Sequence, residues 1–310
     1  MINVYESVDS NKRKSWIIIA GFIIFVLVAS VLIAKGLAAY YGYQSSGFEL
    51  TGFALIISGV MSFISYYASD SIILGISGAR PADKRRDFLF FTVAENLSLA
   101  AGLPMPKLYV IEDTAMNAFA TGRDPAHASV CATAGLLAKL NRTELEGVIG
   151  HELSHVVNYD TRLMSVVTIL IGLVTLLGDW LLRSMWWGGG RRSRDNDNGN
   201  AGAIFMVLGI LLAILSPIIA QLIQLAISRQ REFLADASSV KLTRQPSGLI
   251  SALKKLGADQ EPLEAANKAT AHLYIVNPFK GIHGHLDWLS GLFNTHPPLT
   301  DRIKTLEQMS

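Results

Sequence analysis

The sequence is poor in residues on which several classes of protein depend. Cys131 is the one cysteine among 310 residues, so the chain forms no internal disulfide and offers no cysteine-based zinc site. Charged residues make up only 17%, and no run of lysine and arginine alternates with aromatic residues, so nothing indicates a nucleic-acid partner. Half of the residues are hydrophobic and the mean hydropathy is +0.35, which indicates that part of the chain lies in a lipid bilayer.

Four long runs without a charged residue account for much of this hydrophobicity. They cover residues 16–34, 50–69, 163–178 and 201–227. Such runs are typical of transmembrane helices, so we expect two membrane hairpins with about four transmembrane helices. The third run is shorter and reaches Trp187 only by including Asp179 and Arg183. The first run exceeds the apolar core of a signal peptide, which favours an uncleaved anchor.

The flanking charges predict the orientation of these hairpins. Basic residues gather at positions 12–14 and 80–86, on either side of the first hairpin, whereas only Lys35 lies between its two runs. Because basic flanks tend to stay on the cytoplasmic side, both ends of this hairpin are expected to face the cytoplasm. Three arginines at positions 191–194 oppose this rule if the second hairpin crosses completely, so a partial insertion stays open.

The spacing of two histidines in a predicted helix indicates a metal site. Apolar residues recur at helical spacing over residues 144–159, and Asn141 or Thr143 is available as a cap. His151 and His155 lie one turn apart on the same face of this helix, so their ring nitrogens can bind one metal ion.

Glu152 lies beside this histidine pair rather than in line with it. Its position suits a general base that acts on a metal-bound water. Gly147 and Gly150 come just before the motif, where small residues allow close approach of a substrate or simply tight packing of another helix.

A catalytic zinc ion requires a third protein ligand and an open fourth position. Residues 228–236 continue the fourth apolar run as a helix, with Glu232 and Asp236 on one face. We predict that Glu232 binds zinc, and that Asp236 accepts the outer N–H of a ligating histidine. The alternative is a solvated acidic face whose carboxylates pair with Arg229 or Arg231.

The segment Arg231-Glu232-Phe233-Leu234-Ala235-Asp236, following the histidine motif across a hydrophobic hairpin, resembles the HtpX-type membrane zinc metalloprotease family. That family is related to the CAAX prenyl endopeptidases, and the resemblance covers nearly the whole chain. It implies an α-helical membrane protein with an α+β zincin-like (gluzincin) catalytic domain. It further implies one zinc ion held by His151, His155 and Glu232, with Glu152 as the catalytic residue.

Asp160 also matches a recurrent position of the family. Its role stays open between ordering the site and ending the helix as a cap. Four parts of the chain are expected. They are an N-terminal transmembrane hairpin (1–79), a first part of the catalytic domain with the zinc-binding helix (80–162), a second membrane hairpin (163–227) and a second part of the catalytic domain with the third ligand (228–310).

Two further segments resemble parts of such a peptidase site. Residues 116–122, ahead of a predicted strand at 128–133, resemble a cleft-lining segment in which Asn117 and Ala118 pair with an extended substrate; an ordinary hairpin loop is the alternative. Near the end, His296 is expected to donate to the oxyanion of the tetrahedral intermediate, with Arg302 supporting it or binding a substrate carboxylate. A proline-started helix with a purely structural role is the alternative there.

These features together predict a zinc-dependent endopeptidase that is multi-pass in the cytoplasmic (inner) membrane, with its catalytic domain in the cytoplasm. As the resemblance implies, its substrates are misfolded or damaged membrane proteins, in quality control and the stress response. A CAAX-type processing protease is one alternative. A transporter or channel subunit is another, suggested by polar residues within the apolar runs, although it gives no use to Glu152. The expected partners are polypeptides and the lipid bilayer.

Overall fold

The structure is a computed structural model that describes residues 9–21, 23–24, 60, 63–64, 66–169, 172, 229–266, 270–279 and 297–309. The four charge-free runs fall largely outside these residues, and His296 lies outside them as well. Within the described ranges, none of the helices combines the length and the apolar character needed to cross a membrane.

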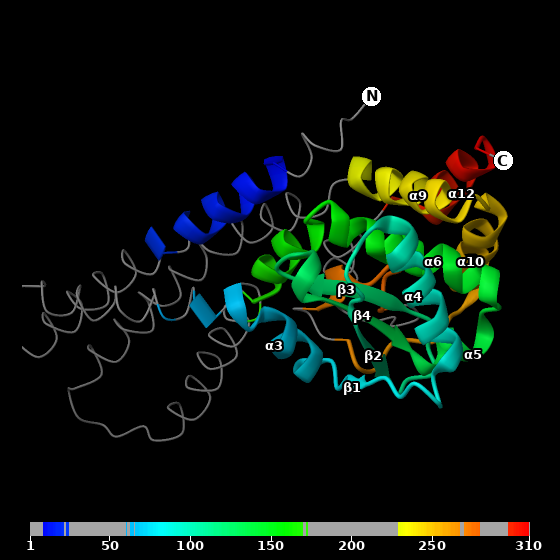
Figure 1. Ribbon diagram of the computed structural model, residues 1–310, viewed down its shortest axis with the longest axis horizontal. Helices are drawn as coiled ribbons and strands as arrows, with labels where there is room; N and C mark the ends of the chain where they lie inside the picture. The colour runs from blue at the N-terminus through cyan, green and yellow to red at the C-terminus, as the bar shows by residue number, and fades with distance from the viewer. Residues whose placement is uncertain are drawn as a thin grey trace, which may run out of the picture.

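A four-stranded sheet forms the centre of the described chain (Figure 1). Its strands are β1 (Arg80–Pro81), β2 (Lys107–Ile111), β3 (Ala118–Gly122) and β4 (Ala128–Thr133), in the order β1-β2-β4-β3. β2 and β4 are parallel, whereas β1 and β3 run antiparallel to their neighbours. The strand predicted at 128–133 is confirmed as β4. The segment at 116–122, which the sequence left open between a cleft-lining segment and a loop, contains the edge strand β3.

Both faces of this sheet are covered, because side chains alternate between two hydrophobic clusters. Leu108, Val110, Ala120 and Val130 face the helices α4 (Phe88–Ala101) and α6 (Arg142–Val157). On the opposite face, Ile111, Phe119 and Cys131 pack with α3 (Ser69–Ile76) and with the helix of residues 160–169. Shorter elements are α5 (Ala134–Lys139) and the 3₁₀ turns η1 (Pro125–His127) and η2 (Ala271–Leu273).

Helix α6 begins and ends with clear local signals. Of the two predicted caps, Asn141 is the one used, because its side chain accepts from the Glu144 amide while Glu144 accepts from the Asn141 amide. The helix ends at Val157, and Tyr159 then adopts a left-handed φ of 58°. After this short turn, Asp160 starts a new helix close to the end of α6.

Three further helices pack on or next to α6: α9 (Arg229–Thr243), α10 (Pro246–Ala258) and α12 (Leu299–Glu307). The close packing requires glycine. A Cβ atom at Gly147 would lie 2.7 Å from the backbone nitrogen of Leu249 in α10, and one at Gly150 would lie 2.8 Å from Ser239 Oγ in α9. Of the two readings of these glycines, tight helix packing is therefore the one that the structure supports.

Candidate active site

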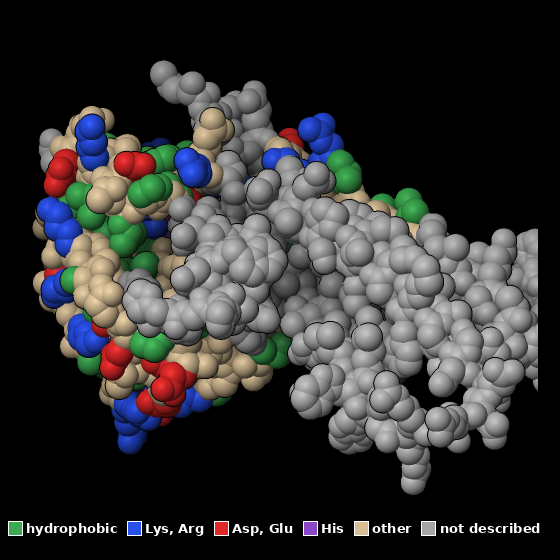
Figure 2. Space-filling view, turned by 180° about the vertical axis from the view of Figure 1, so that it is seen from behind, with side chains coloured by type: hydrophobic (Ala, Val, Ile, Leu, Met, Phe, Trp, Pro, Cys, Tyr) green, Lys and Arg blue, Asp and Glu red, His purple; other side chains and the backbone are tan. Residues whose placement is uncertain are grey.

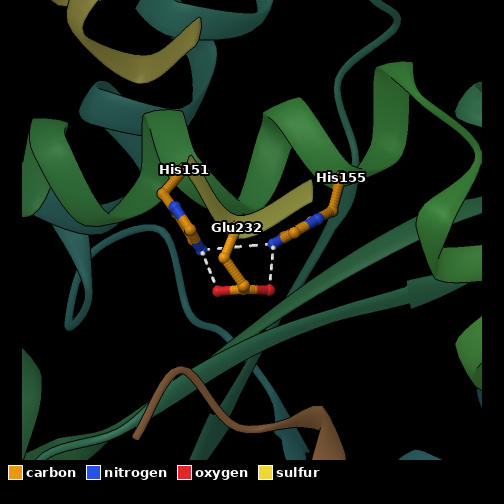
Figure 3. A group of neighbouring side chains, drawn as sticks. All are labelled: His151, His155 and Glu232. Carbon is orange, nitrogen blue, oxygen red and sulfur yellow. Dashed lines mark hydrogen bonds and ion pairs between the residues drawn. The ribbon is translucent and has the colours of Figure 1, made fainter. Parts of the chain in front are cut away.

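The three predicted metal ligands converge on one point (Figure 3). The Nε2 atoms of His151 and His155 are 3.2 Å apart, and each lies 3.5–3.6 Å from a carboxylate oxygen of Glu232. All three side chains are buried, and their ligand atoms lie within 4.8 Å of one another. In the part of the chain that the structure describes, no other group of histidine, cysteine and acidic residues is arranged in this way.

The outer nitrogens of both histidines face carboxylates. His151 Nδ1 lies 2.9 Å from Asp236 Oδ1, and His155 Nδ1 lies 3.0 Å from Asp160 Oδ2. An Nδ1–H that donates to a carboxylate leaves the lone pair of Nε2 free for a metal. Two such lone pairs and a carboxylate facing one another would repel without a cation between them. The donor set therefore fits a metal ion.

Arg302 lies behind these ligands with no surface exposed. It donates from Nη2 and Nε to the two oxygens of Asp236, at 2.6 and 2.8 Å, and its Nη1 lies 3.6 Å from Glu232 Oε2. The sequence predicts a contact with a substrate carboxylate as one role of Arg302. The buried position does not suit that role and instead fits a guanidinium that holds the carboxylates of Asp236 and Glu232.

Glu232 and Asp236 do not form the solvated acidic face that the sequence left as an alternative. Both side chains are buried, and Arg231 pairs instead with Asp160, its Nη1 lying 3.2 Å from Asp160 Oδ1. Helical spacing did not predict this contact between Arg231 and Asp160. A helix pattern shows which residues share a face, but not which distant group a side chain will contact.

Buried charges shift the protonation of these groups. Burial and Arg302 lower the pKa of His151, but its hydrogen bonds to Asp236 and Glu232 outweigh both and raise it to about 9. Burial raises the pKa of Asp236, yet Arg302 and His151 hold it below its usual value. Asp236 and Arg302 therefore form a buried ion pair at neutral pH, and protons compete with metal ions for His151.

Glu152, in α6, is buried. Its charge contributes to raising the pKa of Arg302 on one side and of Cys131 in β4 on the other. The pKa of Cys131 is raised above all by burial, and this thiol is free and enclosed, as expected for a small core residue. The charge of Glu152 therefore acts on Arg302, the residue that also contacts Asp236 and Glu232.

The outer edge of β3 is in contact with residues 270–279 of the chain itself, the orange segment beside β3 in Figure 1. The Ile275 amide donates to the Ala118 carbonyl at 3.1 Å, and Asn117 Nδ2 donates to the Val276 carbonyl at 2.9 Å. The groups predicted to pair with a substrate are therefore engaged within the chain. Ala120 presents its backbone groups on the same edge, because every second residue of an antiparallel strand does so.

Comparisons with known proteins agree with this site. The sequence profile of "Peptidase family M48" matches residues 91–310. A "Protease HtpX homolog" from Dictyoglomus thermophilum is 46% identical over 309 residues, which cover 98% of this chain and 94% of that protein. Another, from Caldanaerobacter subterraneus subsp. tengcongensis, is 45% identical over 310 residues, which cover 99% of this chain and 98% of that protein.

Among solved structures, S. mikatae Ste24p matches with a TM-score of 0.44 and 19% identity, over 94% of this chain and 66% of that chain, a likeness too distant to add to the argument. The profile covers most of the chain, including the candidate ligands His151, His155 and Glu232. The resemblance noted in the sequence is thereby confirmed, and a transporter or channel subunit is excluded as the main function. The chain belongs to peptidase family M48 and is a membrane-associated metalloendopeptidase.

Proposed function

We propose that this metalloendopeptidase uses zinc and hydrolyses peptide bonds in misfolded or damaged proteins of the cytoplasmic membrane. The observation that carries the proposal is the convergence of His151, His155 and Glu232 within 4.8 Å, each buried and two of them oriented by aspartates. Two imidazoles and one glutamate are a common ligand set of catalytic zinc, and they leave a position open for chemistry.

The residues around the ligands have separate roles in this proposal. Zinc, when bound, polarises the scissile carbonyl and makes water more acidic. Glu152 takes a proton from the attacking water and then passes it to the leaving amine, so one carboxylate serves as base and acid. Asp236 and Asp160 hold the histidine rings, and Arg302 holds Asp236. His296 remains our candidate donor to the oxyanion.

An extended substrate would add to the edge of β3, the usual way in which a peptide binds a sheet edge. Asn117 and Ala118 would pair with it, and Ala120 would extend the pairing. Because Ile275 and Val276 hold the same groups, binding at Ala118 requires residues 270–279 to move.

Aromatic and basic side chains near the predicted hairpins support a position at the bilayer. Trp16 stacks on Tyr66, and the guanidinium of Arg162 lies 4.9 Å above the Tyr66 ring. Phe63 packs on Tyr67 with their ring centroids 4.5 Å apart, and both rings are largely exposed. Exposed aromatics beside arginine are typical of the membrane–water interface. Away from this region, Figure 2 shows acidic and basic side chains interspersed over the described surface, a pattern suited to water.

We therefore propose hairpins at 1–79 and 163–227 and a cytoplasmic catalytic domain built from 80–162 and 228–310. A site tethered to the bilayer would meet membrane-anchored segments at high local concentration, so selection would be by position more than by sequence. The same tethering would serve a CAAX-type enzyme, and cleavage of a prenylated peptide in preference to an unfolded membrane segment would favour that alternative.

The direct test uses the purified full chain, its zinc content and the cleavage of casein and of a model loop in anchored and soluble forms. We expect about one zinc per chain, loss of cleavage with a zinc chelator and recovery on adding zinc. Glu152→Gln should keep the metal and lower the rate by a factor of about 10²–10⁴. Cleavage that survives in Glu152→Gln, or that ignores the chelator, would overturn the mechanism. Equal cleavage of anchored and soluble loops would overturn selection by position.

A further inference from the structure

The helix of residues 9–21 reaches the surroundings of the metal site through one side chain. Asn11 is buried, and its Nδ2 donates to Asp160 Oδ1 at 2.7 Å and to the Asn158 carbonyl at 2.9 Å. Both acceptors belong to the turn that follows the zinc-binding helix. On the next residue of the same helix, Lys12 Nζ lies 4.4 Å from the centre of the Tyr159 ring, so the helix packs against the whole turn.

Asp160 is the group through which Asn11 can affect the ligands. One oxygen, Oδ2, lies 3.0 Å from His155 Nδ1, while the other, Oδ1, accepts from Asn11 and from Arg231. A carboxylate held at both oxygens cannot rotate about its terminal bond without breaking one of these contacts. The orientation of the His155 ring therefore depends on what holds Oδ1.

Arg231 connects the same group to the third ligand. Its Nη1 lies 3.2 Å from Asp160 Oδ1 and 3.4 Å from Asn11 Oδ1, and the next residue in α9 is Glu232. The amide of Asn11 thus donates to Asp160 and accepts from Arg231 at once. Three segments far apart in sequence meet there: the N-terminal helix, the turn after α6, and the start of α9.

Ser15 provides a comparison on the same helix, because its side chain makes a different contact. Ser15, one turn further along, is equally buried, but its Oγ donates to the backbone carbonyl of Asn11 in its own helix. Ser15 therefore contributes to helix packing, whereas Asn11 contacts the aspartate that orients a ligand. This difference provides a matched control within one turn of helix.

We propose that Asn11 is a positioning residue for the metal ligand His155, acting through Asp160, and that the N-terminal helix is thereby a part of the active site. The inference rests on the proposed function of His151, His155 and Glu232 as zinc ligands. Since this helix leads into the first predicted membrane span, the segment nearest the bilayer would help to hold a ligand in place. The zinc site would be complete only when the N-terminal helix is packed against the turn that follows α6.

The test compares full-length Asn11→Ala and Ser15→Ala in detergent with the unaltered protein. For Asn11→Ala we expect zinc affinity, measured by competition with a chelator, to fall by about 10- to 100-fold, with a lower kcat and a similar KM for casein. The visible spectrum of the Co²⁺-loaded protein should change as well, because it reports the ligand geometry. Ser15→Ala should leave the affinity and the spectrum unchanged.

Equal changes in both variants, or an unchanged affinity and spectrum in Asn11→Ala, would overturn the inference. If Asn11→Ala does not fold, Asn11→Ser takes its place, since it keeps a short polar side chain but cannot both donate to Asp160 and accept from Arg231 over the same distance. The failure of the proposed function looks different. In that case the unaltered protein itself would bind no zinc or cleave without it.

Discussion

Arg302 of α12 and Asp236 of α9, 66 residues apart, form a two-pronged ion pair with distances of 2.6 and 2.8 Å. Neither residue has more than 1% of its surface exposed. Asp236 also faces the outer nitrogen of His151, so the last described helix of the chain contacts the carboxylate that orients this candidate metal ligand in α6. The site is therefore assembled from α6, α9 and α12 together.

Replacing Arg302 tests this arrangement. Arg302→Met removes the cation and leaves Asp236 buried without its main partner, so we expect a loss of about 3–5 kcal/mol in the free energy of unfolding. Thermal and denaturant unfolding of the purified protein measure it. Lys304→Met, on the exposed side of the same helix, should change stability by less than about 0.5 kcal/mol. Similar losses in both variants would contradict a special role of Arg302.

Gly147→Ala tests the close packing of α6 on α10. The new Cβ would lie 2.7 Å from a backbone nitrogen that cannot simply rotate away, so we expect a loss of about 1–3 kcal/mol. Gly75→Ala is the matched control, because Gly75 lies in α3 with nothing within 4 Å of the added Cβ. It should be neutral or stabilise by up to about 1 kcal/mol through helix propensity. A stable Gly147→Ala protein would show that the helices move apart easily.

The buried carboxylate of Glu144 should make the free energy of unfolding depend on pH. Burial raises the pKa of Glu144, but hydrogen bonds from Lys255, Ser251 and the Asn141 amide outweigh it and hold the pKa below the usual 4.5. A lowered pKa in the folded protein stabilises it above pH 4.5, and this contribution is lost as the pH falls through the folded value.

We therefore expect Glu144→Gln to cost about 1.5–3 kcal/mol at pH 7, the range for hydrogen bonds to a charged group. The difference from the unaltered protein should shrink below pH 4.5, as measured by denaturant unfolding at a series of pH values. Glu146→Gln, which loses only an exposed pair with Arg142, should show a small difference at every pH. A difference for Glu144→Gln that stays constant down to pH 3 would contradict the assignment.

The variant Asn117→Ala distinguishes between two possible roles of Asn117 at the edge of β3: pairing with substrate, and holding residues 270–279 in place. If Asn117 pairs with substrate, the variant should raise KM several-fold and leave kcat nearly unchanged. If it only holds residues 270–279, its kinetic effect should match that of Thr168→Val, which removes the hydrogen bond between Thr168 and His272 on the same segment. Steady-state cleavage of one peptide by both variants makes the comparison, and matching KM values would argue against substrate pairing at Asn117.

Local patterns in the sequence were sufficient for the main parts of the site. Helical spacing predicted that His151 and His155 share a face, and the same reasoning set Glu232 and Asp236 one turn apart. Strand β4 also matches the strand predicted at 128–133. These predictions succeeded because backbone geometry alone fixes the relative positions of residues within a turn of helix or along a strand.

Only the tertiary structure decided which buried groups meet across elements. It paired Arg302 with Asp236, placed Asp160 between His155, Arg231 and Asn11, and set Ile275 on the edge of β3. No periodicity in the chain encodes such contacts, because they depend on how whole helices pack, as at Gly147. The sequence by itself predicted the candidate ligands and the candidate base, and the fold determined which groups contact them, since a buried polar group must find its partner wherever packing brings one within reach.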